Sequence, residues 1–166
     1  GNLLEVLDPY NRKVFEHVYD LNQTQEDEDG EKQPLTPLWT KHIDSGESIL
    51  LFDVLGKPIE SSNANDAQSL TSYDKLNRPT NGWTKNDLSD SLRLTSYIIY
   101  GEEAIDPKNI NLLGQLWQQY NESGKVETIE FDFKGNLLSK KQLVISSSTL
   151  KTALDNYQTY LVNWTG

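Results

Sequence analysis

The segment Tyr73-Asp74-Lys75-Leu76-Asn77-Arg78-Pro79-Thr80 carries the pattern that decides the fold. An aromatic residue precedes an Asp, and three positions after the Asp comes a residue that tolerates a positive φ. The Asp side chain can accept hydrogen bonds from backbone N–H groups two residues on, while Asn or Gly adopts the positive φ that a tight turn requires. The segment therefore predicts a β-hairpin, with its turn at Asp74.

The same pattern recurs along the chain. Its copies are Phe52-Asp53-Val54-Leu55-Gly56-Lys57, Tyr120-Asn121-Glu122-Ser123-Gly124-Lys125 and Phe131-Asp132-Phe133-Lys134-Gly135-Asn136. Near the N-terminus, Asp8-Pro9-Tyr10-Asn11-Arg12 fits its second half and Val18-Tyr19-Asp20-Leu21-Asn22 its first half. We expect the repeated positions to shape hairpins: Tyr19, Asp20, Phe52, Asp53, Gly56, Tyr73, Asp74, Asn77, Arg78, Tyr120, Gly124, Phe131, Asp132 and Gly135.

Alternating side chains beside these turns favour strands, which we expect at 13–19, 94–100, 116–120 and 137–144. Because short turns join neighbouring strands directly, the sequence predicts a mainly β fold, an antiparallel meander of hairpins.

Four stretches depart from the hairpin pattern. Residues 25–33 form a polar, acidic loop, and residues 81–91 form a second polar loop around Trp83. Within 102–114, Asp106 as N-cap and Pro107 in the first turn predict a short helix. Leu150, Leu154, Tyr157 and Leu161 recur at helical spacing and predict a C-terminal helix that begins at Ser148. We expect one compact unit, with a β-sheet region over 1–147 and a helical segment over 148–166.

Composition excludes several functions. The 166 residues carry a net charge of −10, which repels phosphates and anionic lipids and argues against a nucleic-acid partner. Cys is absent, so disulfides and thiolate metal sites are excluded. No apolar run reaches the length of about 18 residues that a bilayer span needs. Met is absent even at position 1, and we expect the chain to be a piece of a longer protein.

The tract 49–142 resembles the RHS/YD-repeat family, in particular the repeat shell of insecticidal toxin complex proteins. The hairpin segments quoted above carry the resemblance, together with Ile99-Tyr100-Gly101-Glu102, Asn111-Leu112-Leu113-Gly114-Gln115-Leu116-Trp117-Gln118-Gln119-Tyr120 and the continuation Leu137-Leu138-Ser139. Asn121 stands where the pattern usually has Asp, and the Tyr19-Asp20 unit lacks its Gly.

The resemblance implies a hollow shell of YD-type hairpins that encloses a toxic domain, in a bacterial protein that is secreted or presented at the cell surface. The repeats would form walls and carry no chemistry. Their partners would be neighbouring repeats of the same protein and an enclosed toxin domain. A fragment cut from such a wall would expose a sheet edge, through which we expect a homodimer.

Candidate chemistry is sparse. Asp53, Asp74 and Asp132 occupy equivalent turn positions, so turn capping accounts for these carboxylates without a glycosidase-type acid and base pair. His17 and His42 are distant in the sequence and no second ligand type follows either at a metal-binding spacing, and the acidic run before Gly30 fails the calcium-loop spacing. We therefore predict no catalytic residues, no metal site and no cofactor.

Exposed tryptophan is the basis of an alternative function. Trp83 and Trp39 do not share a repeat position, and Trp83 follows Asn81-Gly82 in a polar stretch. An aromatic platform of this kind could bind carbohydrate or protein. The sequence thus leaves open a non-catalytic wall fragment and, as the alternative, a carbohydrate- or protein-binding adhesion module.

Overall fold

The computed structural model describes residues 2–19, 25–26, 32–33, 36–146 and 148. The N-terminal strands are β1 (Glu5–Leu7), β2 (Lys13–Val18), β3 (Gln25–Glu26), β4 (Lys32–Gln33) and β5 (Trp39–His42). They are followed by β6 (Gly46–Phe52), β7 (Pro58–Asn63), β8 (Gln68–Tyr73), β9 (Pro79–Lys85) and β10 (Arg93–Tyr100). The 3-10 helix η1 (Gly101–Glu103) precedes β11 (Leu116–Asn121), β12 (Gly124–Phe131) and β13 (Leu137–Val144).

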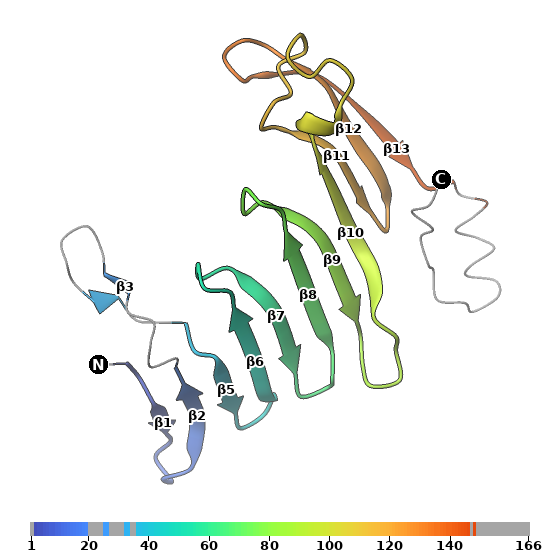
Figure 1. The fold of residues 1–166 in the computed structure, drawn as a ribbon. Coiled ribbons are helices and arrows are strands. Elements are labelled where there is room, and N and C mark those ends of the chain that lie inside the picture. The colour runs from blue at the N-terminus through green and yellow to red at the C-terminus, as the bar shows by residue number, and fades with distance from the viewer. Residues whose placement is uncertain (1, 20–24, 27–31, 34–35, 147, 149–166) are drawn as a thin grey trace. The chain divides into compact units, whose positions relative to one another are not determined.

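Eleven strands form a sheet in the order β1-β2-β5-β6-β7-β8-β9-β10-β11-β12-β13, and β3 pairs with β4 (Figure 1). The pairs whose register is defined are antiparallel, for example Tyr97↔Tyr120 and Tyr120↔Lys125. Neighbours in the sheet follow one another in the sequence except at β2 and β5, between which β3 and β4 pair with each other. The expected mainly β antiparallel meander is therefore confirmed.

The chain divides into two compact units, and each is described by itself. The first contains Gly1–Leu70 and Thr84–Leu92. There Phe15 from β2 lies across from His42 of β5, with ring centroids 4.4 Å apart. His42 Nδ1 accepts the backbone N–H groups of Asp44 and Ser45, which fixes the β5–β6 turn.

The second unit contains Thr71–Trp83 and Arg93–Gly166. Its centre is Leu112, which is the one buried hydrophobic side chain among the described residues and has no exposed surface. Leu112 belongs to the connection 101–115 between β10 and β11, defined here as the β10–β11 loop. Asn111 Nδ2 donates to the Phe131 carbonyl, and the Phe131 N–H donates to the Ile110 carbonyl. These bonds hold the loop against the end of β12.

Two elements differ from the sequence-based expectations. Trp83, expected in a polar loop over 81–91, lies in β9 and is half-buried; only the residues after Lys85 form a connection. Thr80 and Asn81 extend β9 despite their polarity, because their side chains bond to Ser72 on β8. The short helix is η1, which ends before Asp106.

Asp106 is not an N-cap. Its φ is 54°, in the left-handed region that Asp tolerates better than most residues, and 106–111 form turns. The acidic stretch 25–33 begins and ends in the paired strands β3 and β4, where a continuous loop was expected. The expected C-terminal helix lies outside the described residues except for Ser148, and Asp20 also lies outside them.

Candidate functional site

Five turns of one geometry recur along the sheet, at 8–12, 53–57, 63–67, 74–78 and 132–136. In each, the side-chain Oδ1 of the first residue accepts the backbone N–H groups of the third and fifth residues, at 2.8 to 3.3 Å. The fourth residue has a φ between 59° and 81°. We call this arrangement the five-residue turn. It matches the three-residue hairpin loop, in which a type I turn is followed by a left-handed residue.

The backbone at Gly56, Asn77, Gly124 and Gly135 has the positive φ expected from the sequence. Gly124 does not lie in a five-residue turn, because it starts β12 opposite Asn121, directly after a two-residue loop. Its φ is 142°, and a Cβ there would lie 2.1 Å from the Leu143 carbonyl oxygen of β13. Glycine at this position is thus required by the close approach of the next strand.

The turn at 63–67 was missed by the sequence analysis. Its first residue is Asn63, no aromatic residue precedes it, and Asp66 occupies the fourth position with a φ of 59°. Asn63 Oδ1 still accepts the N–H groups of Asn65 and Ala67. The signal that could have found it is the Asn at the end of a strand, followed three positions later by a residue that tolerates the left-handed region.

The fifth residue of most turns adds a second interaction with the first. Arg12 and Arg78 donate to the Oδ2 atoms of Asp8 and Asp74, and Asn136 does the same to Asp132. Lys57 Nζ lies 2.7 Å from Asp53 Oδ2. These contacts explain why a basic or amide side chain recurs at this position of the sequence pattern.

Hydrogen bonding lowers the pKa of the turn carboxyl groups. The backbone N–H of Arg78 is the largest cause for Asp74, whereas the side chains of Lys57 and Asn136 are the largest causes for Asp53 and Asp132. Each hydrogen bond favours the ionised form of the Asp side chain. An ionised carboxylate accepts these hydrogen bonds, whereas a protonated carboxyl group has lost part of its capacity to accept them.

These shifts predict that the turns loosen in acid. A folded-state pKa below the unfolded value of 3.8 means that the stabilisation is complete above that value and is lost as the pH falls through the folded pKa. We expect the amide signals of Leu76 and Arg78 to change below a pH of about 3.8, following the titration of Asp74. A two-dimensional NMR titration from pH 7 to about pH 1 measures this change.

The turn at Asn63 is the internal control for this titration. It has the same backbone hydrogen bonds without a titratable first residue. Asp66 lies between the two reporter amides, so the comparison uses protection against amide exchange instead of signal position. The hydrogen bonds of Asn65 and Ala67 to Asn63 should persist over the range in which those of Leu76 and Arg78 are lost. Equal loss of protection at both turns would contradict the assignment of the acid response to the turn carboxylates.

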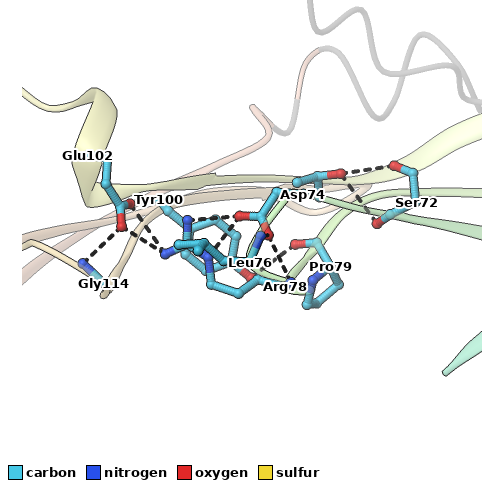
Figure 2. A network of polar contacts seen from close by, with 9 residues as sticks. Ser72, Asp74, Leu76, Arg78, Pro79, Tyr100, Glu102 and Gly114 are labelled. Carbon is cyan, nitrogen blue, oxygen red and sulfur yellow. Dashed lines mark hydrogen bonds and ion pairs between the residues drawn. The ribbon is translucent and has the colours of Figure 1, made fainter. Parts of the chain in front are cut away.

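A polar network extends from the Asp74 turn to the β10–β11 loop (Figure 2). Arg78 Nε donates to Asp74 Oδ2 at 2.8 Å, and its Nη1 donates to Glu102 Oε1 at 3.0 Å. The guanidinium carbon lies 3.8 Å from the centre of the Tyr100 ring. Tyr100 in turn donates its hydroxyl to the Pro79 carbonyl at 3.0 Å. One Arg side chain thus joins a turn, a strand and a loop.

Glu102 completes this network. Its carboxylate accepts from Arg78 and from the backbone N–H of Gly114, at 3.2 Å. The hydrogen bond from Arg78 is the largest cause of the lowered pKa of Glu102. The sequence pattern identified Asp74 and Arg78 as turn residues but gave no role to Tyr100 or Glu102. The network holds the β10–β11 loop to the β8–β9 turn.

Substitution of Arg78 tests the network. Arg78→Lys keeps the positive charge. The lysine ammonium group cannot, however, donate hydrogen bonds to both Asp74 and Glu102 and at the same time stack on the Tyr100 ring. We expect the thermal unfolding midpoint to fall by about 3 °C or more. Calorimetry measures it.

Arg12→Lys is the matched control. Arg12 has the same position in its turn and bonds to Asp8, but its side chain is 64% exposed against 22% for Arg78. Its replacement should change the midpoint by less than about 1 °C, because an exposed ion pair contributes little. An equal fall of the unfolding midpoint in the two variants would mean that the contacts of Arg78 with Glu102 and Tyr100 do not stabilise the fold.

The two tryptophans proposed as binding residues lie in strands. Trp83 in β9 and Trp39 in β5 are both half-buried, and Trp39 Nε1 donates to Glu47 at 3.4 Å. They lie in different units of the structure. Binding of carbohydrate at either residue stays a prediction.

The described part of the chain shows neither a carboxyl group with a clearly raised pKa nor a cluster of metal-binding side chains. Every carboxyl group there with a resolved shift has a lowered pKa, whereas a general acid of the glycosidase type requires a raised one: Asp8, Asp53, Asp74, Asp87, Glu102, Glu127 and Asp132. No cluster of three His, Asp or Glu suited to a metal ion occurs among these residues. Within the same residues, no helix is long and apolar enough to cross a membrane.

Comparisons with known proteins agree with the resemblance seen in the sequence. No family model matches the chain. It is 26% identical to toxin subunit YenC2 of Yersinia entomophaga over 184 residues, which cover all of this chain and 17% of the relative. The chain thus spans about a sixth of that relative's length.

Solved structures share the fold. A Photorhabdus luminescens Tc holotoxin pore matches 93% of this chain with a TM-score of 0.68 at 23% identity, over 6% of its own chain. A TcdB2-TccC3 crystal structure matches 98% of this chain with a TM-score of 0.63 at 19% identity, over 9% of its own chain. The resemblance to the repeat proteins of toxin complexes is therefore confirmed.

Proposed function

We propose that this chain is a non-catalytic wall segment of a longer bacterial toxin-complex protein of the RHS/YD-repeat type. The observation that carries the proposal is the five-residue turn, which uses its polar side chains to shape the backbone at five places. The Asp and Arg residues that stand out in the sequence are thereby assigned to hydrogen bonds within turns. In this proposal the protein acts by shape, and it is not an enzyme.

The edges of the sheet support a role within a larger wall. The edge strands are β1 and β13, and both have exposed side chains throughout. Leu7 on β1 is 47% exposed, and Val144 on β13 is 71% exposed. Strand edges with unpaired backbone groups and apolar side chains are suited to pairing with another strand. We assign this pairing to neighbouring repeats of the same protein.

The small buried core supports the same role. Of the described hydrophobic residues, only Leu112 is fully buried, while most strand side chains are half-buried. A sheet of this kind gains stability from further layers or strands that cover it, as repeat proteins do when each unit buries the face of the next. In the proposed wall, residues 1–147 would form the repeat sheet and residues 148–166 a helical segment.

The partner and the location follow from the resemblance. The relative is a toxin subunit, and TcdB2 and TccC3 occur together in a solved complex. By analogy, we infer a wall that encloses a toxin domain in a secreted or surface-delivered bacterial protein. The homodimer of a separated fragment through a free edge of β1 or β13 stays a prediction from the sequence, and we propose no more than pairing with neighbouring repeats for these edges.

Protease protection tests the proposed function. The protein translated from the whole reading frame around this chain is purified with its toxin domain and exposed to a nonspecific protease. If the sheet is part of an enclosing wall, the toxin domain stays intact until the wall is denatured. Gly101→Ala, which should disrupt the second unit, is expected to allow digestion, whereas Gly114→Ala should retain protection. Equal digestion of the toxin domain with and without the intact wall would overturn the proposal.

A further inference from the structure

Large apolar side chains protrude from consecutive turns of the second unit. Leu76 is 64% exposed, Ile105 is 93% exposed and Phe133 is 86% exposed, and Leu113 in the same loop as Ile105 is 47% exposed. We call these four residues the apolar rim. They belong to the β8–β9, β10–β11 and β12–β13 connections. In an antiparallel meander alternate connections lie at the same end of the strands, so the rim follows one end of the sheet.

The turns themselves do not require these side chains. The hydrogen bonds common to the five-residue turns join the side chain of the first residue to backbone N–H groups of the third and fifth. The side chains of Leu76 and Phe133, the third and second residues of their turns, take no part in them. Ile105 lies outside the hydrogen bonds that close the β10–β11 loop. A hydrophobic side chain left in water gains nothing from folding, because its surface stays hydrated. The rim therefore points to a contact outside this unit.

The size of the rim fits a protein interface. Together the four side chains expose on the order of 500 Å² of apolar surface, comparable to the largest apolar patch of a typical monomer, which is often functional. Charged residues flank it, namely Lys75, Lys108, Lys134, Glu103 and Asp106, all of them exposed. When the aliphatic parts of these charged side chains are added to the four apolar side chains, the exposed apolar area approaches the roughly 800 Å² that each partner buries in a standard interface.

We propose that the apolar rim binds the apolar rim of a second copy of this chain. The protruding residues recur once per hairpin, about 10 Å apart along the sheet. A second row of the same turns offers matching spacing. The β10–β11 loop also carries both signs of charge, so Lys108 of one copy can lie near Glu103 or Asp106 of the other. A two-fold interface requires such self-complementarity.

This contact is distinct from pairing through β1 or β13. The rim lies at the ends of strands and needs no backbone hydrogen bonds, whereas edge pairing uses the backbone groups along a strand. It also does not depend on the proposed wall function. If the chain did not associate through the rim, a toxin domain could still be protected from protease. If the toxin domain were not protected, the rim contact could still form.

Sedimentation velocity of the chain between 5 and 500 μM tests the association. We expect a reversible dimer whose dissociation constant rises at least tenfold in Phe133→Ser and in Ile105→Ser. Leu88→Ser is the matched control, because Leu88 is 76% exposed but lies in the β9–β10 connection, at the other end of β10. Circular dichroism verifies that each variant folds.

Cross-linking locates the contact. The chain has no Cys, so a single introduced thiol reports one position. Oxidation should convert Ile105→Cys to a disulfide-linked dimer, while Leu88→Cys and Lys140→Cys on edge strand β13 should remain largely monomeric. A chain that is monomeric at 500 μM would overturn the proposal, as would a dimer that Phe133→Ser leaves unchanged or one that only Lys140→Cys captures.

Discussion

Replacement of Gly101 by alanine should cost about 3 kcal/mol of unfolding free energy or more. A Cβ at Gly101 would lie 1.9 Å from the backbone oxygen of Leu112 and 2.7 Å from its Cβ. Backbone cannot rotate out of the way as a flexible side chain can. The Gly101 N–H also bonds to the Gln115 carbonyl, so both ends of the β10–β11 loop would have to separate.

Gly114→Ala is the matched control within the same loop. Gly114 has a φ of 77°, but nothing lies within 4 Å of the position of a Cβ. Its substitution should therefore cost only the left-handed conformation, about 1 kcal/mol. Urea unfolding of both variants measures the difference. If the two substitutions destabilise equally, the close packing of Gly101 on Leu112 does not stabilise the second unit.

Leu112→Ala should destabilise the protein by about 3 kcal/mol, through the lost burial of the side chain and the cavity it leaves. Leu112 has no exposed surface, and the loop is wound around it: its N–H donates to the Pro107 carbonyl, and its own carbonyl accepts from Gln115. The side chain fills the space that these turns enclose. Its removal leaves a loop held by hydrogen bonds alone.

The neighbour Leu113 provides the control for this prediction. Leu113 is 47% exposed, so Leu113→Ala should cost less than about 1 kcal/mol. Urea unfolding gives the free energies, and amide exchange of Gly101 and Gln115 shows whether the loss is local to the loop. Similar costs for the two leucines would mean that Leu112 does not form a core.

The hairpins could be predicted from the sequence because their cause is local. Asp53, Asp74 and Asp132 each bond within four residues, and the residue that takes the positive φ lies inside the same segment. The turn at Asn63 is equally local, but its Asp66 at the left-handed position is less distinctive than Gly or Asn. A search for Asn or Asp at strand ends alone would have found it.

Long-range contacts could not be predicted in the same way. Arg78 and Glu102 are 24 residues apart in the sequence, and nothing in either segment shows that they meet. The position of Trp83 in a strand could not be predicted either. The residues before it, Thr80, Asn81 and Gly82, are as common in loops as in strands, and their pairing with the strand that contains Ser72 is a tertiary contact. Asp106 resembled a helix cap because Asp is common both at caps and in left-handed turns.

The most direct test of the wall function is a cryo-EM structure of the protein translated from the whole reading frame around this chain. If the chain is a wall segment, β1 and β13 each hydrogen-bond to a further strand from outside 1–166, and the sheet borders a closed space that holds the toxin domain. A structure in which both edges face solvent and the chain stands as a separate domain with a ligand in a cleft would contradict the wall function.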